Sequence, residues 1–417
     1  MLVFKFGGAS VKDAEGIANL AKVVKLYADQ QLLIVVSAMG KTTNALEKLA
    51  RAYADKTDDV HELYEGVKQY HFGIINELFE SSHPVHDEVA NTFVEIDWMI
   101  EDDPQDEFDF IYDQLVSVGE LVSTRIVASY LNKEGLKAKW VDVRGYIHTD
   151  NTYREGVGQW DKTIESIKQG IPPLLENNIV VTQGFLGGTS ENFTTTLGRE
   201  GSDYTASIFA ACLGAESVTI WKDVPGVLNA DPKHFADTVK FDELTYTEAI
   251  EMTYYGATVI HPKTIKPLQN KHIPLLVKPF NEPQAAGTII KENAIMNFAK
   301  PVIIIKQNQV LLSLSAKDYS FISEDHLSDI FSRFAKNHIK INVMQTSALS
   351  FTVCFDLDEQ RFQKLLQDLT DFNTKHNTGL TLLTTRHYKD ETLNELTLNK
   401  TILLEQLSRN TAQLVVK

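Results

Sequence analysis

The stretch from residue 3 to residue 11, Val-Phe-Lys-Phe-Gly-Gly-Ala-Ser-Val, constrains the fold more than any other part of the chain. Apolar residues on both sides of Lys5 predict a strand, and the pair Gly7-Gly8 ends it. Ser10 leads into apolar residues spaced for one helix face, which predict a helix after Asp13. Glycines let backbone N–H groups approach an anion, and a helix N-terminus favours negative charge. The stretch therefore predicts either a phosphate-binding turn with a lysine beside it or an ordinary strand–helix turn with a surface lysine.

The composition is that of a globular protein of two or three domains. The chain has 417 residues, of which 43% are hydrophobic and 23% charged. A formal net charge of −16 argues against nucleic acid and anionic membranes as partners, although a local basic pocket can still bind a phosphate. No apolar run reaches the ~18 residues of a membrane span, and we expect no signal peptide before the first strand. Cys212 and Cys354 lie among apolar residues and give no disulfide framework, which predicts a reducing, cytoplasmic location.

Alternating strand and helix patterns predict an α/β domain over residues 1–296. Several of its apolar runs lack alternation, as expected for strands buried on both faces of a parallel sheet. Residues 45–131 read as almost continuous helix and predict a helical insertion between two strands. We interpret the acidic run at 101–107, which interrupts this insertion, as a solvated loop rather than a metal site. Besides the first strand, the predicted strands are 33–37, 139–143, 179–185, 217–221 and 274–278.

The pattern changes near residues 291–300, and residues 297–417 predict a second domain. Its elements follow one another as strand, helix, strand, strand, helix and strand, which is the ferredoxin-like βαββαβ arrangement. The last stretch, 393–417, predicts a further strand and helix. The predicted strands of this domain are 310–315, 341–346, 349–356 and 379–384, and the predicted helices are 324–336 and 359–372.

The polar turn at residues 194–203 is the strongest candidate for a substrate site. It follows the predicted strand 179–185 and precedes a predicted helix at 204–213. Arg199 suits bidentate recognition of a carboxylate, and Ser202 with the neighbouring N–H groups suits an anion at a helix start. The alternative is a capped helix with a salt-bridged arginine, but that structure does not need so many polar residue types in one turn.

Three other segments carry residues suited to ligands. Residues 35–44 predict a strand that opens into a hydroxyl-rich turn, but this is not a P-loop, because Val35 stands where that motif needs glycine. Glu120, on a predicted apolar helix, is either a surface glutamate or an acid that holds an ammonium group. The Pro-Gly turn after strand 217–221 is suited to a nucleotide base and ribose, or is only a well-formed turn. Neither a dinucleotide-binding glycine fingerprint nor histidines at metal-ligand spacing occur, so we expect no protein-bound metal.

Taken in order, these segments resemble the aspartate kinases of the amino acid kinase family. The resemblance covers nearly all of residues 2–290, and its most specific runs are Lys-Phe-Gly-Gly-Ala-Ser-Val, Thr-Thr-Leu-Gly-Arg-Glu-Gly-Ser-Asp-Tyr-Thr-Ala and Gly-Ala-Thr-Val-Ile-His-Pro. Residues 303–385 resemble an ACT module, an amino acid sensor. The resemblance implies a three-layer amino acid kinase fold, with a mostly parallel central sheet and helices on both faces, followed by a ferredoxin-like ACT domain. The implied reaction is phosphoryl transfer from MgATP to the β-carboxylate of L-aspartate, the first step towards lysine, threonine and methionine.

The resemblance also implies a role for each candidate residue. Lys5 and Asp203 are expected to be catalytic, because the lysine would neutralise the transferring phosphoryl group and the acid would orient the lysine. Mg²⁺ is expected on the phosphates and water, with no dedicated protein ligand. The residues implied for aspartate are Thr43, Glu120, Phe185, Arg199 and Ser202. The residues implied for ATP are Lys5, Gly7, Gly8, Ser10, Lys222, Asp223 and Lys233.

The chain also departs from the family pattern. Ala9 replaces the usual threonine of the first motif, and Glu200 replaces a common glycine. Thr258 stands where many relatives carry a nucleotide-facing lysine, a charge that Lys222 would supply from the neighbouring loop. Only one complete βαββαβ unit fits where relatives usually carry two interleaved ACT modules, so the second module is predicted to be incomplete. The turn at 323–325 lacks the glycine whose N–H normally meets the effector.

These observations leave two hypotheses about function. One is an active aspartate kinase, and the other is a catalytically silent homologue that acts as an amino acid sensor or regulatory subunit. The departures at Ala9 and Thr258 favour the silent homologue, whereas the joint presence of Lys5, Arg199 and Asp203 favours the enzyme. We further expect a homodimer or higher homo-oligomer that associates through the ACT domain, with weak or absent inhibition by lysine.

Overall fold

The computed structural model describes residues 1–257, 260–298 and 300–417, which divide into two compact units. Two short segments from the first 296 residues group with the C-terminal part of the chain rather than with their sequence neighbours. The first unit comprises Met1–Val227, Lys240–Ile250 and Val259–Met296, and the second comprises Leu228–Val239, Glu251–Thr258 and Asn297–Lys417.

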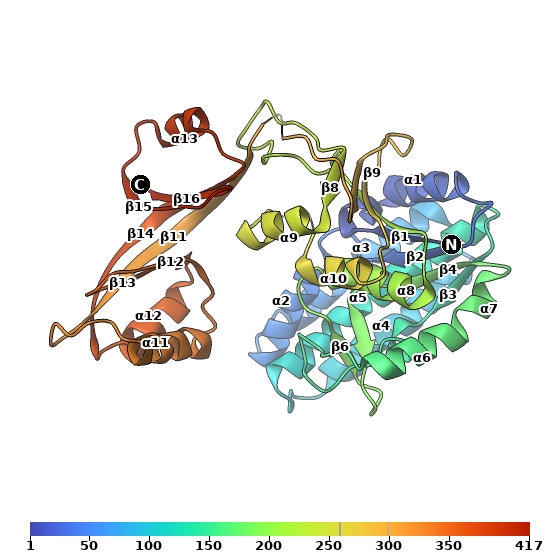
Figure 1. The fold of residues 1–417 in the computed structure, drawn as a ribbon. Coiled ribbons are helices and arrows are strands. Elements are labelled where there is room, and N and C mark those ends of the chain that lie inside the picture. Colours follow the sequence, from blue (N-terminus) through green and yellow to red (C-terminus); the bar gives the residue numbers. More distant parts are fainter. Residues whose placement is uncertain (258–259, 299) are drawn as a thin grey trace. The chain divides into compact units, whose positions relative to one another are not determined.

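A single sheet of eight strands forms the centre of the first unit, in the order β3-β4-β2-β1-β7-β9-β10-β8 (Figure 1). The six strands from β3 to β9 are parallel, and β10 is antiparallel to β9. All five strands predicted beyond the first are present within two residues of their predicted bounds. The strands are β1 (Leu2–Phe6), β2 (Leu32–Val36), β3 (Ala138–Val141), β4 (Ile179–Gln183), β7 (Ser217–Lys222), β8 (Glu243–Thr245), β9 (Leu275–Pro279) and β10 (Thr288–Lys291).

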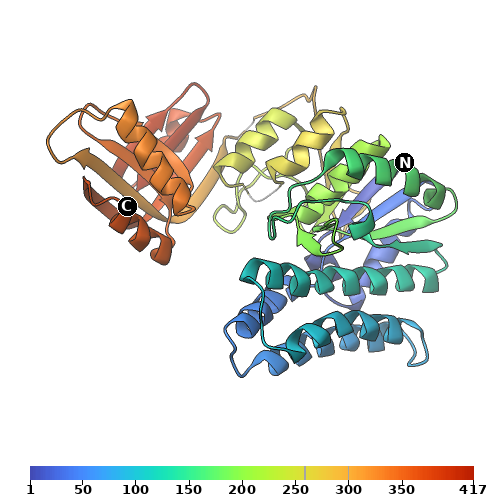
Figure 2. The ribbon, with the colours of Figure 1, turned by 90° about the horizontal axis from the view of Figure 1, so that it is seen from below.

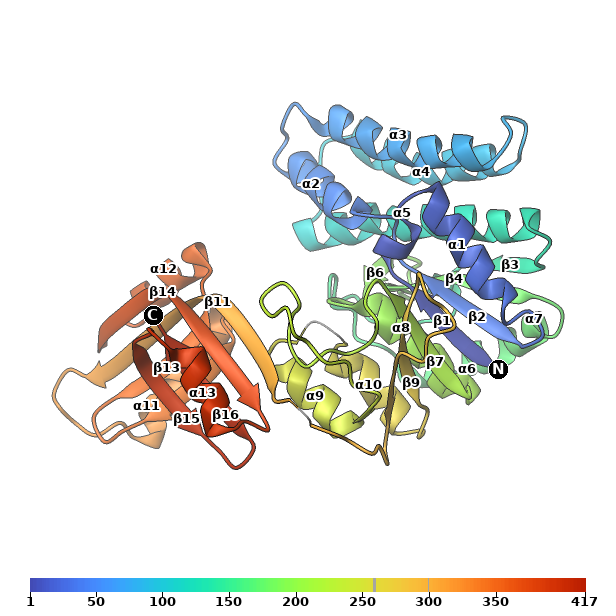
Figure 3. The same cartoon turned by 90° about the horizontal axis from the view of Figure 1, so that it is seen from above.

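Helices cover both faces of this sheet, as predicted (Figures 2 and 3). The insertion predicted at 45–131 consists of α2 to α5, which lie with α1 on one face, whereas α6, α8 and α10 lie on the other. The acidic run 101–107 is mostly exposed between α4 and α5, which confirms a solvated loop. No helix among the described residues is long and apolar enough to cross a membrane. The helices are α1 (Ala14–Lys25), α2 (Thr42–Ala54), α3 (Val60–Leu78), α4 (Val85–Glu101), α5 (Phe108–Lys133), α6 (Trp160–Gly170), α7 (Pro172–Leu175), α8 (Gly201–Leu213), α9 (Tyr246–Tyr255) and α10 (Pro262–Gln269).

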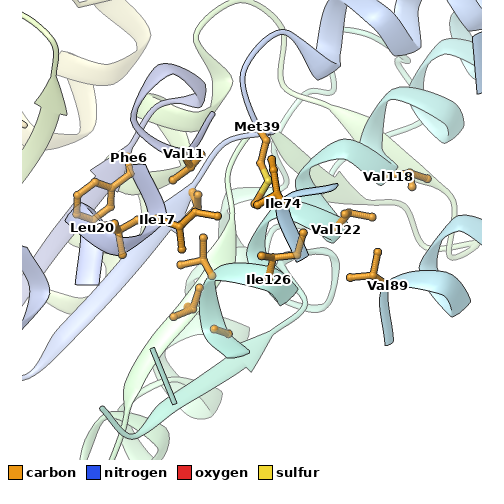
Figure 4. Close-up of a cluster of buried hydrophobic side chains, with 14 of the residues drawn as sticks. Phe6, Val11, Ile17, Leu20, Met39, Ile74, Val89, Val118, Val122 and Ile126 are labelled. Carbon is orange, nitrogen blue, oxygen red and sulfur yellow. The ribbon is translucent and has the colours of Figure 1, made fainter. Parts of the chain in front are cut away.

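One continuous hydrophobic core joins the sheet to the helical insertion (Figure 4). Phe6 of β1, Ile17 of α1 and Met39 after β2 are buried in it, together with Ile74 of α3 and Ile126 of α5. The long helix α5 is buried on almost every side, because it packs against β3 and β4 on one side and against α2 and α4 on the other. A polar residue on α5 is therefore more often inside the protein than at its surface.

The second unit contains the predicted βαββαβ arrangement in the predicted order. Three predicted bounds are wrong. β11 begins at Val302 rather than residue 310. β14 begins at Phe372 rather than residue 379, because it pairs with β11 along its whole length, and the helix before it ends at Asp368. The stretch 393–417, predicted to hold a further strand and helix, contains the end of a helix and a two-stranded hairpin that extends the sheet. The elements are β11 (Val302–Ala316), α11 (Glu324–Lys336), β12 (Ile341–Thr346), β13 (Phe351–Asp356), α12 (Glu359–Asp368), β14 (Phe372–Arg386), α13 (Asp390–Thr397), β15 (Ile402–Leu407) and β16 (Thr411–Val416), with sheet order β12-β13-β11-β14-β16-β15.

Candidate active site

The candidate residues of the first unit gather where the central parallel strands end. β1 lies between β2 and β7, so that Phe6 pairs with Val36 on one side and with Trp221 on the other. Val36 in turn pairs with Gln183 at the end of β4. In parallel sheets of this kind, ligands bind outside the carboxyl ends of the strands. The segments that follow β1, β2, β4 and β7 therefore lie at the edge where a site is expected.

Lys5 and Asp203 form a buried ion pair at this edge. Lys5 Nζ lies 2.6 Å from Asp203 Oδ1, and the two side chains are only 11% and 4% exposed. Lys5 comes from β1, and Asp203 comes from the first turn of α8. The structure thus brings together the two residues that were predicted to be catalytic, and the carboxylate holds the ammonium group in one position.

The glycine turn after β1 is a 3₁₀ helix, Gly8–Val11, and α1 begins only at Ala14. Ser10 N donates to Gly7 O over 2.9 Å, and Gly40 N donates to Gly8 O over 3.0 Å. A Cβ atom on Gly8 would lie 2.6 Å from Ala38 O, so only glycine lets this turn approach the turn after β2 so closely. The turn therefore brings backbone groups close to Lys5, as a phosphate site requires.

Glu120 is buried inside α5, which contradicts its interpretation as a surface residue. It is 2% exposed, and its Oε1 accepts a hydrogen bond from Ala38 N over 3.3 Å. Its Oε2 is also buried and has no hydrogen-bond partner among the described residues. Burial raises the pKa of Glu120 to about 8, although the charge of Lys5 acts in the opposite direction. A carboxylate in this position is suited to a cationic ligand group, which would satisfy the second oxygen.

We predict that Glu120→Gln stabilises the protein increasingly as the pH rises from 5 to 8.5. Because the fold raises the pKa of Glu120 from 4.5 to about 8, the native state binds more protons than the unfolded state between these values, and stability falls as the pH rises through this window. Glutamine carries no charge and avoids this loss. Thermal unfolding at several pH values measures the effect, at roughly 2–4 °C for each kcal/mol.

The control for this experiment is Glu62→Gln, which removes an exposed glutamate from α3. Its difference in melting temperature from the parent should vary with pH less than that of Glu120→Gln. If the difference for Glu120→Gln is equally flat, Glu120 does not carry a perturbed charge.

The end of β4 is locked against the start of α8. Phe185 adopts a left-handed conformation with φ of 71°. Its N–H donates a hydrogen bond to Thr205 Oγ1 over 3.1 Å, and its carbonyl oxygen accepts one from Leu197 N over 2.8 Å. A Cβ atom on Gly184 would lie 2.4 Å from Ser202 Cβ, so the strand end can touch the helix only through glycine. Phe185 and the buried Ser202 are therefore neighbours, as the predicted site requires.

The sequence analysis missed a short hairpin and the buried aspartate that anchors it. The hairpin consists of β5 (Leu186–Gly188) and β6 (Thr194–Thr196). Asp113 of α5 is fully buried and accepts three hydrogen bonds, from Thr196 N at 2.9 Å, Thr196 Oγ1 at 2.7 Å and Arg154 N at 2.8 Å. Burial raises its pKa to about 6. The only signal in the sequence was an acid within an apolar helical run.

The turn after β6 presents Arg199 at the surface. Arg199 is exposed and, among the described residues, no acid lies within ion-pair distance of it. This contradicts the alternative of a salt-bridged arginine. Glu200, next to it, caps α8 in a left-handed conformation with φ of 54°, a region that favours glycine. Its carboxyl is partly buried and close to Asp203, and both effects raise its pKa.

We predict that Glu200→Gly raises stability by about 1 kcal/mol. The left-handed conformation costs a non-glycine residue about 1–2 kcal/mol, and glycine avoids this cost. Glycine also has more conformational freedom in the unfolded chain, which reduces the gain in stability. Glu200 Oε2 also lacks a hydrogen-bond partner among the described residues. Urea unfolding measures the change. Glu200→Ala removes the carboxylate but keeps the strain, so it should gain less; an alanine variant as stable as the glycine variant would rule out backbone strain as the cause.

The remaining candidate residues come from α2, from β7 and from the segments that follow β7. Thr43 lies in the first turn of α2, half-buried. Lys222 ends β7, and its positive charge partly opposes the rise in the pKa of Glu200 caused by burial and Asp203, whereas Asp223 is exposed. Lys233 belongs to the second unit, so its contact with the nucleotide stays a prediction. Thr258 lies outside the described residues.

Comparison with known proteins agrees with this arrangement. The model of the amino acid kinase family matches residues 1–279. Lysine-sensitive aspartokinase 3 of Escherichia coli strain K12 is 31% identical over 356 residues, which cover 85% of this chain and 78% of that protein. The chain belongs to the aspartokinases of the amino acid kinase family. Another aspartokinase, the chloroplastic aspartokinase 3 of Arabidopsis thaliana, is 33% identical over 396 residues, which cover 88% of this chain and 67% of that protein.

Solved aspartokinase structures share the whole fold. E. coli aspartokinase III in complex with aspartate and ADP, in its R-state, matches with a TM-score of 0.86 and 27% identity over 100% of this chain and 96% of that one. The T-state of the same aspartokinase, in complex with lysine and aspartate, matches with a TM-score of 0.82 and 28% identity over the same shares of the two chains. The fold predicted for the chain is thereby confirmed, including its C-terminal antiparallel sheet.

Proposed function

We propose that this aspartokinase transfers a phosphoryl group from MgATP to the β-carboxylate of L-aspartate, giving 4-phospho-L-aspartate. The observation that carries the proposal is the convergence of three features at one sheet edge. These are the buried Lys5–Asp203 pair, the glycine turn at Gly7 and Gly8, and Glu120 with its unpartnered oxygen. The E. coli aspartokinase III solved with aspartate and ADP supports the same pair of ligands.

On the aspartate side, each proposed contact matches the chemistry of the residue. Arg199 would bind the α-carboxylate, because its planar guanidinium meets a carboxylate through two parallel hydrogen bonds. Glu120 would bind the α-ammonium group through Oε2, and Phe185 would form an apolar wall. Thr43 and Ser202 would supply hydroxyl groups at helix starts.

On the nucleotide side, the residues fit a phosphate group because Lys5 and the turn from Gly7 to Ser10 lie together at the end of β1. Lys5 would neutralise the charge of the transferring group, and Asp203 would keep the ammonium in position. Bound Mg²⁺ supplies further charge neutralisation on the phosphates, without a dedicated protein ligand. We propose Lys222, Asp223 and Lys233 for the rest of the nucleotide.

An assay that couples ADP release to aspartate tests the function, with glutamate and N-acetylglutamate as competing acceptors. Hydroxylamine in the same assay traps an acyl phosphate as a hydroxamate, which separates phosphoryl transfer from ATP hydrolysis. Hydroxamate formed only with aspartate is expected. Binding of aspartate by calorimetry without ADP release would instead support the silent sensor, which Ala9 favours.

We propose a regulatory and dimerisation role for the domain 297–417, as an ACT domain whose second module is incomplete. Its sheet ends in β12 and β15, and unpaired strand edges readily associate with a second copy in a two-fold dimer. Met344 of β12, at the first of these edges, is 52% exposed. We also propose a cytoplasmic location and a place at the start of lysine, threonine and methionine synthesis.

We predict weak or absent inhibition by lysine. The N-terminus of α11 is occupied by its own capping box, in which Ser323 and His326 exchange hydrogen bonds, and its first turn carries Glu324 and Asp325. An effector carboxylate would meet these acids, which is unfavourable. Titration of lysine and threonine into the kinase assay measures inhibition, with the E. coli lysine-sensitive enzyme as positive control. Half-inhibition below about 1 mM, an affinity of roughly 4 kcal/mol, would contradict the prediction.

A further inference from the structure

A pocket separate from the candidate active-site residues lies in the first unit, on the face of the sheet opposite the helical insertion. It has a volume of about 700 Å³, within the ~300–1,000 Å³ typical of small-molecule sites, and helices α6, α8 and α10 contribute to its walls. None of the residues proposed above for aspartate or ATP lines it. Its apolar walls come from Trp160, Ile164, Leu197, Tyr204, Ala211 and Pro267.

Two aromatic rings form part of this wall. Trp160 begins α6 and Tyr204 lies in the first turn of α8, and their ring centroids are 6.4 Å apart at an interplanar angle of 73°. Trp160 is 40% exposed, an unusual degree for a side chain of this size. An edge-to-face pair of this kind offers the face of one ring to a flat apolar guest.

Positive charge surrounds the same pocket. Lys168 of α6, Lys263 and Lys266 of α10, and Lys271 after α10 all line it, against a single acid, Glu155. All four lysines are exposed, and none of them forms an ion pair within 4.0 Å in the part of the chain that the structure describes. This cluster is notable on a chain with a formal net charge of −16. Lysine ammonium groups act as point charges and bind carboxylate, phosphate or sulfonate groups alike.

We propose that this pocket binds a small organic anion with a flat apolar body. The body would pack against Trp160 and Tyr204, and the acidic group would meet the lysines of α6 and α10. Leu197 and Tyr204 lie at the two ends of the turn that carries Arg199. The ligand would therefore contact this turn at its ends, on the side that faces the pocket. The proposal does not depend on the proposed reaction, because it uses different residues.

A pair of dyes tests both parts of the proposal on the full chain. The anionic probe is 8-anilino-1-naphthalenesulfonate, and its neutral counterpart N-phenyl-1-naphthylamine has the same rings without the sulfonate. We expect Lys168→Gln/Lys271→Gln to weaken the anionic dye at least tenfold and the neutral dye less than twofold, measured by fluorescence titration. Trp160→Ala should weaken both dyes. Lys22→Gln/Lys48→Gln, which removes two exposed lysines of α1 and α2, is the matched control and should change neither.

Three results would overturn the proposal. The first is an equal loss of affinity for the anionic dye in the pocket and control variants, which would mean that the dye responds only to the overall charge of the protein. The second is undiminished binding of both dyes by Trp160→Ala, which would place the dye elsewhere. The third is a change of oligomeric state in sedimentation for Lys168→Gln/Lys271→Gln with unchanged dye affinity, which would make this face a contact between copies of the chain.

Discussion

Replacing Lys5 with alanine is expected to lower kcat about a hundred- to a thousandfold, the usual cost of losing one preorganised charge or donor at the reacting group. The effect should fall on kcat more than on either KM, because the lysine acts where charge develops during transfer. Steady-state kinetics with aspartate and ATP measure it. Lys12→Ala, which removes an exposed lysine a few residues further on, is the control and should retain full turnover.

A second variant separates catalysis from folding. Lys5→Ala leaves the carboxylate of Asp203 buried without its cation, and breaking such a pair commonly costs about 3–5 kcal/mol. The double variant Lys5→Ala/Asp203→Asn removes both charges and should recover most of this stability without recovering activity. If the single variant keeps more than about a third of the parent kcat, or if the double variant regains turnover together with stability, Lys5 is not catalytic.

The second large effect is expected for Arg199→Lys, which should raise the KM for aspartate about ten- to a hundredfold and leave the KM for ATP within about twofold. A guanidinium meets the α-carboxylate through two parallel bonds, and hydrogen bonds to charged groups contribute about 1.5–3 kcal/mol. Because Arg199 is exposed and, among the described residues, has no ion-pair partner, the substitution should not change the melting temperature.

The matched control for this prediction is Arg51→Lys, at an exposed arginine of α2 that pairs with Glu47 in the same helix. It should alter neither KM. A rise in the KM for ATP without one for aspartate would assign Arg199 to the wrong substrate, and an unchanged aspartate KM would remove it from the site.

The elements that the sequence predicted well are those with a strong local pattern. The parallel strands of the first unit are rich in apolar residues, β2 without interruption, and α5 is a long apolar helix, so these elements could be found without knowledge of their neighbours. Short elements whose structure depends on distant partners could not. β5 and β6 have three residues each, and Asp113 from another part of the chain anchors their hairpin. The full length of β14 likewise depends on pairing with β11.

The candidate site could likewise be predicted from the sequence only in part. The motif residues Lys5 and Asp203 could be named from the sequence, but their 2.6 Å ion pair joins elements almost two hundred residues apart. For Glu120, the pattern left open a surface glutamate or an acid that holds an ammonium group, and only the packing of α5 between sheet and helices shows that the residue is buried. For Asp113 the one local signal, an acid within an apolar helical run, does not reveal its role, because that role is to hold a distant turn in place.

Helix α5 has one more consequence, for the length of substrate that the site accepts. Asp113 and Glu120 are seven residues apart on it, two helical turns or about 10 Å along one side of a stiff rod. One of them fixes the hairpin that leads to Arg199, the residue proposed for the α-carboxylate, and the other would bind the α-ammonium group. Both groups are attached to the substrate Cα, so this one rigid helix would fix the position of Cα, and the length of the side chain would decide how far the reacting carboxylate reaches towards Lys5. A shift of α5 by a fraction of a turn would therefore change the preference between aspartate and its one-methylene-longer homologue, a difference worth about 1–3 kcal/mol, while every contact residue keeps its identity.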